Sequence, residues 1–183
     1  MNFPVFPNMP ASSKLLVFTS DVTLDPMSSQ SLMSRLDKFL STWSSHGSQL
    51  NSDSVLIANR VLFIAVDESS SIASGCSVDS LTNFIKSEGI ASGVDWFNRH
   101  QVLYRSANQK DFTSDWLVHK LEDFISLIKN GNLAENVQTL NTTVSVVKEA
   151  RESMIQPFLQ SWYSRLVWRF IRPIAVLFLR NSI

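Results

Sequence analysis

Residues 54–86 read SVLIANRVLFIAVDESSSIASGCSVDSLTNFIK, and this stretch decides the predicted fold. Its apolar run to residue 67 is interrupted only by Asn59-Arg60. We predict two strands joined by a hairpin turn there, because one strand of that length would exceed the usual range of about 3–10 residues. The second strand, 61–66, is apolar on both faces, which is typical of a central strand. A Ser-rich loop follows, and Ser77 is the predicted N-cap of the next helix.

Patterns on either side of this stretch predict an α+β fold. Residues 14–20 are apolar between polar residues and predict a strand. Asp25-Pro26 predicts the start of a helix that ends at Gly47, and residues 101–105 predict a fourth strand. The order strand–helix–strand–strand–helix–strand is that of a ferredoxin-like (βαββαβ) antiparallel sheet with two helices.

The chain divides into three predicted regions. Residues 1–13 contain three prolines and are predicted to be extended. Residues 14–142 form the α+β domain, which includes a helix capped by Ser114 and ends in a loop at 132–142. Residues 143–183 are predicted to be a helical, apolar and basic extension, with helices over 143–155 and 157–172, packed on the domain or on a partner.

Composition excludes several classes of protein. The net charge is zero, so we expect no nucleic-acid partner. The charges are unevenly placed, with 11 Lys+Arg against 15 Asp+Glu in residues 1–150. A single cysteine excludes an internal disulfide and an all-cysteine metal site. The longest charge-free run of the apolar end, 173–179, is far below the roughly 20 residues that span a bilayer. With no signal peptide pattern, the sequence predicts a cytoplasmic protein.

Five segments carry a resemblance to a known family. They are FPNMP at 6–10, STWSSHG at 41–47, NRVLFIAVDE at 59–68, ASGCSVDS at 73–80 and QPFLQSWYSR at 156–165. In this order and at these spacings they resemble an uncharacterised family of small bacterial cytoplasmic proteins, with the GCS-x-D segment the most specific part. Members are sometimes labelled ABC transporter ATPases, but this chain has no G-x-x-x-x-G-K-[ST] segment to hold nucleotide phosphates. The chain has Tyr163 where the family has histidine, and the resemblance implies no activity.

Cys76 is the candidate nucleophile. A helix N-terminus stabilises a thiolate, so we consider an enzyme in which His46 is the base and Asp79 orients it. The alternative is structural and is favoured: Cys76 is a small buried residue at a corner, Ser77 is a cap and Asp79 is an acid in the first helical turn.

The loop before the helix is a candidate binding site. Gly75, the hydroxyl groups around Ser77 and the helix N-terminus would suit an anion, although Asp67 and Glu68 would repel one. The same acids with Asp79 and His46 are a weak candidate for a divalent cation, but no pair of them has the spacing of metal ligands, so we expect no metal and no cofactor. A solvated loop is the favoured alternative.

The segment 158–183 is the candidate interaction surface. Its arginines recur along one helical face and its tryptophans lie near another, as in interface anchors or membrane-surface helices. The residues are Trp162, Arg165, Trp168, Arg169 and Arg172. We consider three partners: the acidic body of the same chain, which is favoured, a second copy in a homo-oligomer, and an anionic membrane bound peripherally.

Taken together, these features predict a cytoplasmic ligand-binding or protein-interaction module without catalytic activity. One alternative is a small cysteine-dependent enzyme that uses Cys76. The other is a peripheral membrane protein that binds through its C-terminal basic segment.

Overall fold

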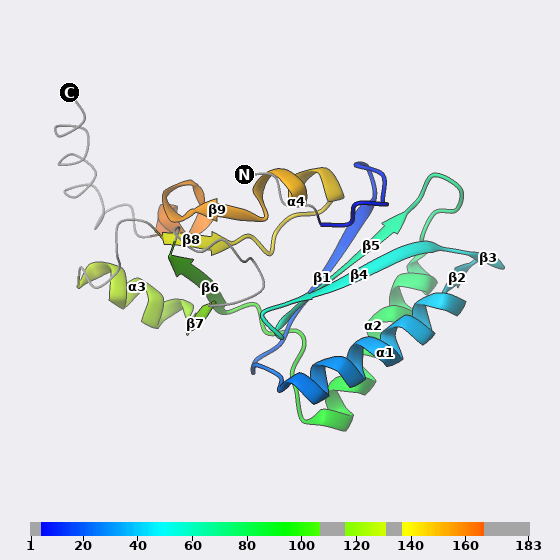
Figure 1. Ribbon diagram of the computed structural model, residues 1–183, viewed down its shortest axis with the longest axis horizontal. Helices are drawn as coiled ribbons and strands as arrows, with labels where there is room; N and C mark the ends of the chain where they lie inside the picture. The colour runs from blue at the N-terminus through cyan, green and yellow to red at the C-terminus, as the bar shows by residue number, and fades with distance from the viewer. Residues whose placement is uncertain (1–4, 107–115, 131–136, 167–183) are drawn as a thin grey trace. The chain divides into compact units, whose positions relative to one another are not determined.

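The computed structural model describes residues 5–106, 116–130 and 137–166, and it shows an α+β chain with antiparallel sheets (Figure 1). The chain folds into two compact units. Of the described residues, unit 1 comprises 5–99 and 142–154, and unit 2 comprises 100–106, 116–130, 137–141 and 155–166. The boundary predicted at 142/143 does not separate these units, because each unit contains residues from both sides of it. No helix among the described residues is both long and apolar enough to cross a membrane.

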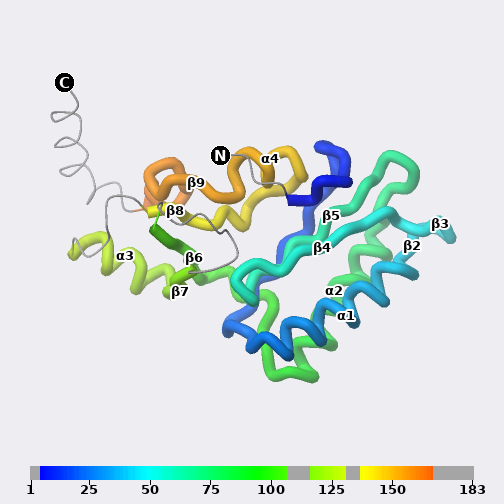
Figure 2. The backbone as a smooth tube through the Cα atoms, viewed as in Figure 1, coloured from blue at the N-terminus to red at the C-terminus, as the bar shows by residue number. Residues whose placement is uncertain are grey.

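Unit 1 is built on a three-stranded antiparallel sheet in the order β1-β5-β4. The strands are β1 (Lys14–Thr19), β4 (Asn51–Ile57) and β5 (Val61–Asp67). Figure 2 traces β4 and β5 as neighbouring paths, and the register pairs Asn51 with Asp67 and Ile57 with Val61. The predicted strand at 14–20, the hairpin and the buried central strand are confirmed, since residues 61–66 are all buried.

The hairpin turn is one residue earlier than predicted. Positive φ angles fall at Ala58 (55°) and Asn59 (50°), and Arg60 donates its amide to Ile57 O at 3.0 Å. Arg60 is buried, and its Nη1 donates to Thr23 Oγ1 at 2.7 Å. The arginine therefore fastens the turn to the segment after β1 instead of adopting the left-handed conformation that suits it poorly.

Two helices cover one face of the sheet, as Figure 1 shows: α1 (Pro26–Thr42) and α2 (Gly75–Ser92). Their apolar stripes pack on the even-numbered side chains of the sheet, because alternate strand residues point to the same face. This core includes Phe18, Leu36, Leu40, Trp43, Leu62, Ile64, Leu81, Ile85 and Trp96.

The helix ends differ from the prediction in two places. Asp25 caps α1 as expected and accepts from Met27 N and Ser28 N. The helix ends at Thr42 and not at Gly47, because Trp43 is already extended. The N-cap of α2 is Ser74 and not Ser77, since the Ser74 side chain accepts from Ser77 N at 3.2 Å.

Three smaller segments complete unit 1. A short hairpin, β2 (Ser44–Ser45) and β3 (Ser48–Gln49), joins α1 to β4. Residues 5–13 and α4 (Val147–Ser153) lie beside β1, where Ser145 O accepts from Leu15 N at 2.8 Å. Arg151 in α4 donates to Val5 O and Met9 O, so the N-terminal segment is held by side-chain bonds to the far end of the chain.

Unit 2 holds a second antiparallel sheet in the order β7-β6-β8-β9. The strands are β6 (Gln101–Ser106), β7 (Leu117–Lys120), β8 (Val137–Leu140) and β9 (Ile155–Pro157). The helix α3 (Leu121–Lys129) and the 3-10 turn η1 (Phe158–Gln160) pack on them. The core is aromatic and apolar: Val102, Tyr104, Phe124, Ile128, Val137, Phe158 and Tyr163.

The ferredoxin-like arrangement is corrected by this second sheet. The predicted fourth strand forms as β6, but it pairs with β7 and β8 and not with the first sheet. In addition, β1 runs antiparallel to its neighbour β5. The two helices and four strands predicted over residues 14–105 are present in that order, with the short β2–β3 hairpin in addition, but this order does not determine which strands pair.

Three predicted elements of the C-terminal half are also corrected. The helix expected from Ser114 begins only at Leu121, because residues 117–120 pair with β6; Ser114 itself lies outside the described residues. The loop expected at 132–142 contains β8. The last predicted helix is replaced at its start by β9 and η1, residues 162–166 are helical, and the remainder lies outside the described residues.

Candidate functional site

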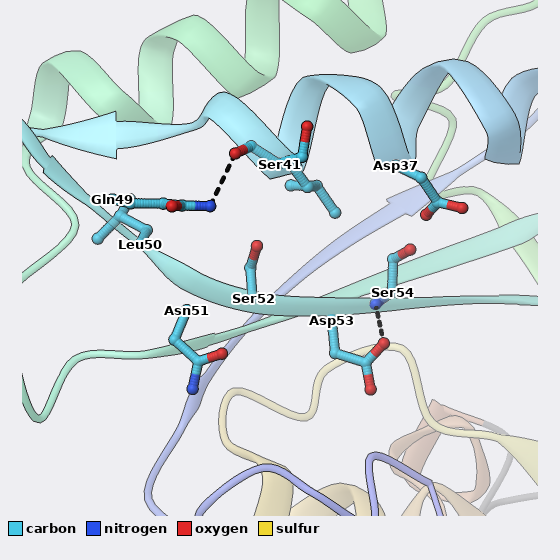
Figure 3. A pocket seen from close by; sticks show the side chains of 9 residues that line it. Asp37, Ser41, Gln49, Leu50, Asn51, Ser52, Asp53 and Ser54 are labelled. Atoms are coloured by element: carbon cyan, nitrogen blue, oxygen red, sulfur yellow. Dashed lines mark hydrogen bonds between the residues drawn. The ribbon is translucent and has the colours of Figure 1, made fainter.

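A cavity of about 480 Å³ lies between α1 and the first residues of β4 (Figure 3). Its volume is within the range of about 300–1,000 Å³ that is usual for ligand pockets. Three residues of α1 and the end of the β2–β3 hairpin contribute to it together with β4. The lining is Asp37, Leu40, Ser41, Gln49, Leu50, Asn51, Ser52, Asp53 and Ser54.

The cavity exists because the chain is tied back to α1 just before β4 begins. Leu50 N donates to Trp43 O at 2.9 Å, and Gln49 Nε2 donates to Ser41 O at 2.7 Å. Leu40 and Leu50 are the two apolar residues of the lining, and both are buried. Beyond them the short side chains of β4 leave the space open.

The side chains of β4 alternate about the strand. In Figure 3, Ser52 and Ser54 point toward α1, where Asp37 and Ser41 lie, whereas Asn51 and Asp53 point the other way. The Asp53 carboxylate accepts a hydrogen bond from Ser54 N at 2.8 Å. The hydroxyl groups of the strand and the Asp37 carboxylate therefore share the side of the cavity that faces the helix.

The lining is rich in hydrogen-bond acceptors and carries negative charge. It contains two carboxylates and no Lys, Arg or His. Such a cavity favours ligands that carry a cationic group or several hydrogen-bond donors. Sequence reasoning missed it, because Asn51-Ser52-Asp53 precedes the predicted strand and the polar face of α1 was read as merely solvated. The available signal was a run of short polar residues at the start of a strand.

A second cavity, of about 410 Å³, contains Cys76 and His46. It lies between the β2–β3 hairpin and the start of α2. Cys76 is exposed, so the interpretation of a buried corner residue is wrong. It is the second residue of α2, whereas the sequence placed it just before the N-cap. Hydroxyl groups dominate the rest of the lining, which includes Thr42, Ser44, Ser45, Ser74, Ser77 and Ser80.

His46 reaches this cavity from a strained turn. His46 and Gly47 at the tip of the hairpin have φ angles of 49° and 82°. The hairpin is held against α2 by Trp43 Nε1, which donates to Ser77 O at 2.8 Å, and by Ser74 N, which donates to Ser45 Oγ at 3.3 Å. The structure thus brings together two of the three predicted catalytic residues. Asp79 is exposed and does not line the cavity.

The predicted binding residues of the loop form hydrogen bonds within the loop and the helix start. The Asp67 carboxylate accepts from Ser69 N at 3.0 Å, and this bond is the main cause of the lowered pKa of Asp67. Glu68 Oε1 accepts from Ala73 N at 3.1 Å and lies 3.8 Å from Lys14 Nζ. These bonds close both ends of the loop.

Gly75 and Ser77 belong to the first turn of α2. Gly75 is exposed, while Ser77 is buried and donates its hydroxyl to Ser74 O at 2.8 Å. Ser77 therefore stabilises the helix start from within.

The predicted C-terminal surface is described only in part. Trp162 is half-buried against the aromatic core of unit 2, with its ring centroid 4.1 Å from that of Tyr163. Arg165 is exposed. Trp168, Arg169 and Arg172 lie outside the described residues.

Comparisons and metal-ligand geometry add no assignment. Within residues 5–106, 116–130 and 137–166, no group of three or more His, Cys, Asp and Glu side chains could hold a metal ion. No family model, no curated protein and no solved structure matches the chain. The family resemblance carried by the GCS-x-D segment stays a prediction.

Proposed function

We propose that this protein is a ligand-binding or protein-interaction module without catalytic activity, and that its ligand enters the cavity between α1 and β4. The observation that carries the proposal is the lining of that cavity: two buried leucines together with hydroxyls, amides and two carboxylates. Seven of the nine lining residues are polar, so the cavity suits a polar ligand that forms several hydrogen bonds. The proposal includes a cytoplasmic location.

The charge of the rim indicates which ligands to test. Asp37 is exposed on α1 and lies on the side of the cavity toward which Ser52 and Ser54 point, whereas Asp53 points the other way and accepts from Ser54 N. A primary ammonium or a guanidinium group would gain charge-assisted hydrogen bonds to the Asp37 carboxylate. A ligand of the same shape without the cation would lose those bonds.

The test is a titration of ¹⁵N-labelled full-length protein followed by NMR. The probes are N-acetyl-lysine methylamide and agmatine, and the neutral control is N-acetyl-norleucine methylamide. We expect the cationic probes to shift the amide signals of Ser41 and residues 49–54, and the neutral probe to bind about tenfold more weakly.

Three variants make this test specific. Ser52→Tyr fills the cavity from a side chain that points into it and should abolish the shifts. Asp37→Asn should weaken binding of the cationic probes. Asp79→Asn, the matched control, removes the same charge from an exposed site outside the cavity and should change nothing. Equal binding by all three variants and the wild type would contradict the proposal.

A second candidate function has one specific observation in its favour. Cys76 and His46 line the same cavity, and Cys76 is exposed in the first turn of an 18-residue helix. In a cysteine-dependent enzyme the His46 imidazole would take the thiol proton, and the helix N-terminus would stabilise the thiolate.

Alkylation of Cys76 by iodoacetamide as a function of pH tests this second candidate. The enzyme hypothesis expects alkylation at neutral pH that is faster than that of a free thiol, and slower alkylation in His46→Gln. Equal rates in the two proteins across the pH range would exclude a thiolate activated by His46. Peripheral membrane binding through residues 158–183 remains a prediction from the sequence.

A further inference from the structure

The two edges of the first sheet differ in how they are covered. The outer edge of β1 is bonded at both ends: Leu15 N donates to Ser145 O and Thr19 N donates to Trp96 O. The outer edge of β4 has no strand beside it among the described residues, because β4 is the last strand in the order β1-β5-β4. Residues 52–56 are accordingly only half-buried, whereas the central strand is fully buried.

The ladder determines which backbone groups of β4 face this open edge. Ser54 N donates to the Asp53 carboxylate and not to β5. In an antiparallel pair, alternate residues direct both their N–H and C=O groups to the partner strand. Ser52, Ser54 and Leu56 therefore direct theirs away from β5. They offer a row of donors and acceptors about 13 Å long, at about 3.3 Å per residue.

The cavity described above lies beside the first half of this row. Ser52 and Ser54, whose backbones face the open edge, also point their hydroxyls toward Asp37 on α1 (Figure 3). A strand laid along the edge would place every second side chain on the same face as these hydroxyls. One such side chain would enter the cavity, where it would meet a carboxylate and no cation.

We infer that the β4 edge accepts an extended peptide as an added strand and that the cavity takes a lysine or arginine side chain of that peptide. This inference rests on the proposed function and deepens it, because it names the class of partner. Main-chain hydrogen bonds to an open edge supply affinity in such complexes, and side-chain pockets supply specificity. The peptide must displace the Asp53 carboxylate from Ser54 N to gain the full set of bonds.

Charge decides between a basic peptide and a second copy of this chain. Pairing two β4 edges would bring the two Asp53 carboxylates close together, and like charges on paired strands are destabilising. Acidic residues on an exposed edge are a known means of preventing such self-pairing. A basic peptide reverses the sign of this interaction, so it is the occupant that the edge favours.

The experiment uses the full-length protein and a seven-residue probe, acetyl-Thr-Val-Thr-Lys-Thr-Val-Thr-amide. Two N-methylated isomers carry methyl groups on alternate amides, one isomer on each edge of the extended peptide. A fourth peptide has glutamate in place of lysine. Binding is followed by ¹⁵N NMR at total peptide concentrations up to about 2 mM.

Strand addition predicts an asymmetry between the two N-methylated isomers. Methyl groups on the edge that faces β4 should weaken binding at least about tenfold, and methyl groups on the other edge should have little effect. The parent peptide should shift the amide signals of Ser52 and Leu56. The glutamate peptide and the Asp37→Asn variant should each bind about tenfold more weakly, with Asp79→Asn unchanged.

The outcomes separate this inference from the proposed function. If N-acetyl-lysine methylamide binds the cavity as tightly as the peptide, or if both N-methylated isomers bind equally, strand addition is refuted while the cavity remains a ligand site. If neither the peptide nor the amino-acid probe shifts residues 49–54, both proposals fail. Light scattering that shows a dimer disrupted by Ser52→Pro, which removes an outward N–H, would identify a second copy as the occupant and overturn the inference.

Discussion

Replacing Gly89 by alanine tests how closely the chain packs where α2 ends. Gly89 is buried within α2, and a Cβ atom added to it would lie 2.4 Å from Val94 O and 3.3 Å from Trp96 Cδ1. Val94 N also donates to Gly89 O at 2.9 Å, so the chain passes directly over this residue as it returns to the sheet. The nearest obstacle is a backbone atom, which cannot move by a simple rotamer change.

The magnitude follows from two opposing effects. Alanine is favoured over glycine inside a helix by about 1 kcal/mol. Overpacking typically costs about 1–3 kcal/mol, and displacing Val94 also weakens a backbone hydrogen bond worth about 1 kcal/mol. We therefore expect Gly89→Ala to lower the free energy of unfolding of unit 1 by about 1–3 kcal/mol.

The assay is hydrogen exchange of the β5 amides at increasing urea concentration, which reports on unit 1 alone. Gly75→Ala is the matched control, because Gly75 is the first residue of the same helix and an added Cβ meets nothing within 4 Å. The control should be neutral or stabilising by up to about 1 kcal/mol. Equal protection of β5 in Gly89→Ala and wild type would refute the close approach of Val94.

Three further predictions concern the caps, turns and ion pairs of unit 1. Hydrogen bonds from Ser28 lower the pKa of Asp25 below its ordinary value of 3.8. The Asp25 carboxylate therefore stabilises the fold above pH 3.8, and this stabilisation is lost as the pH falls through the lowered, folded-state pKa. Asp25→Asn should remove this part of the acid dependence when urea unfolding is measured as a function of pH. Arg35 on α1 and Glu88 on α2 form an ion pair in which Nη2 and Oε2 are 2.6 Å apart. A double-mutant cycle with alanine should give a coupling free energy of about 0.5–1 kcal/mol. The coupling should fall in 1 M salt, because the Arg35 side chain is 47% exposed. Ala58→Gly should raise the free energy of unfolding by roughly 0.5–1 kcal/mol, because Ala58 has a φ of 55°; no gain would argue against the positive-φ turn.

Elements with a complete local signal could be predicted from the sequence. Asp25-Pro26 combines an N-cap side chain with a preset φ angle, and α1 begins there. The apolar run around 59–60 is too long for one strand, and its length alone predicts a hairpin at the polar break. The observed turn lies within one residue of that break. In these cases the residues that determine the local structure and the residues that they contact are neighbours in the sequence.

Elements whose form depends on distant residues could not be predicted. Residues 117–120 continue the helical period of α3, yet they form β7 because they pair with β6. The same pairing removes β6 from the first sheet, and with it the ferredoxin-like order. Sequence order specifies neither pairing, since both depend on which apolar faces meet in three dimensions.

The candidate sites show the same division. That Cys76 stands near a helix N-terminus follows from local pattern, and the structure keeps it there. That His46 lines the same cavity depends on Trp43 Nε1 reaching Ser77 O across 34 positions of sequence. The α1–β4 cavity depends on side chains from two elements. The run of short polar residues that includes Ser52 is a local signal, but no local pattern indicates that Asp37 lies opposite it.

The polar start of β4 accounts for both the cavity and the open edge. An edge strand with large apolar side chains at 52 and 54 would fill the space under α1 and would also expose a flat surface prone to self-pairing. Serine at both positions leaves the space empty, and Asp53 between them occupies one outward N–H and repels a second acidic edge. If the edge accepts an added strand, as we infer, the partner brings backbone donors and acceptors to the edge and positive charge to the cavity. Because the open edge and the cavity share one short segment, Asp53→Ser should both increase self-association and weaken the preference for a basic peptide. If the edge and the cavity were unrelated, only one of these two properties would change.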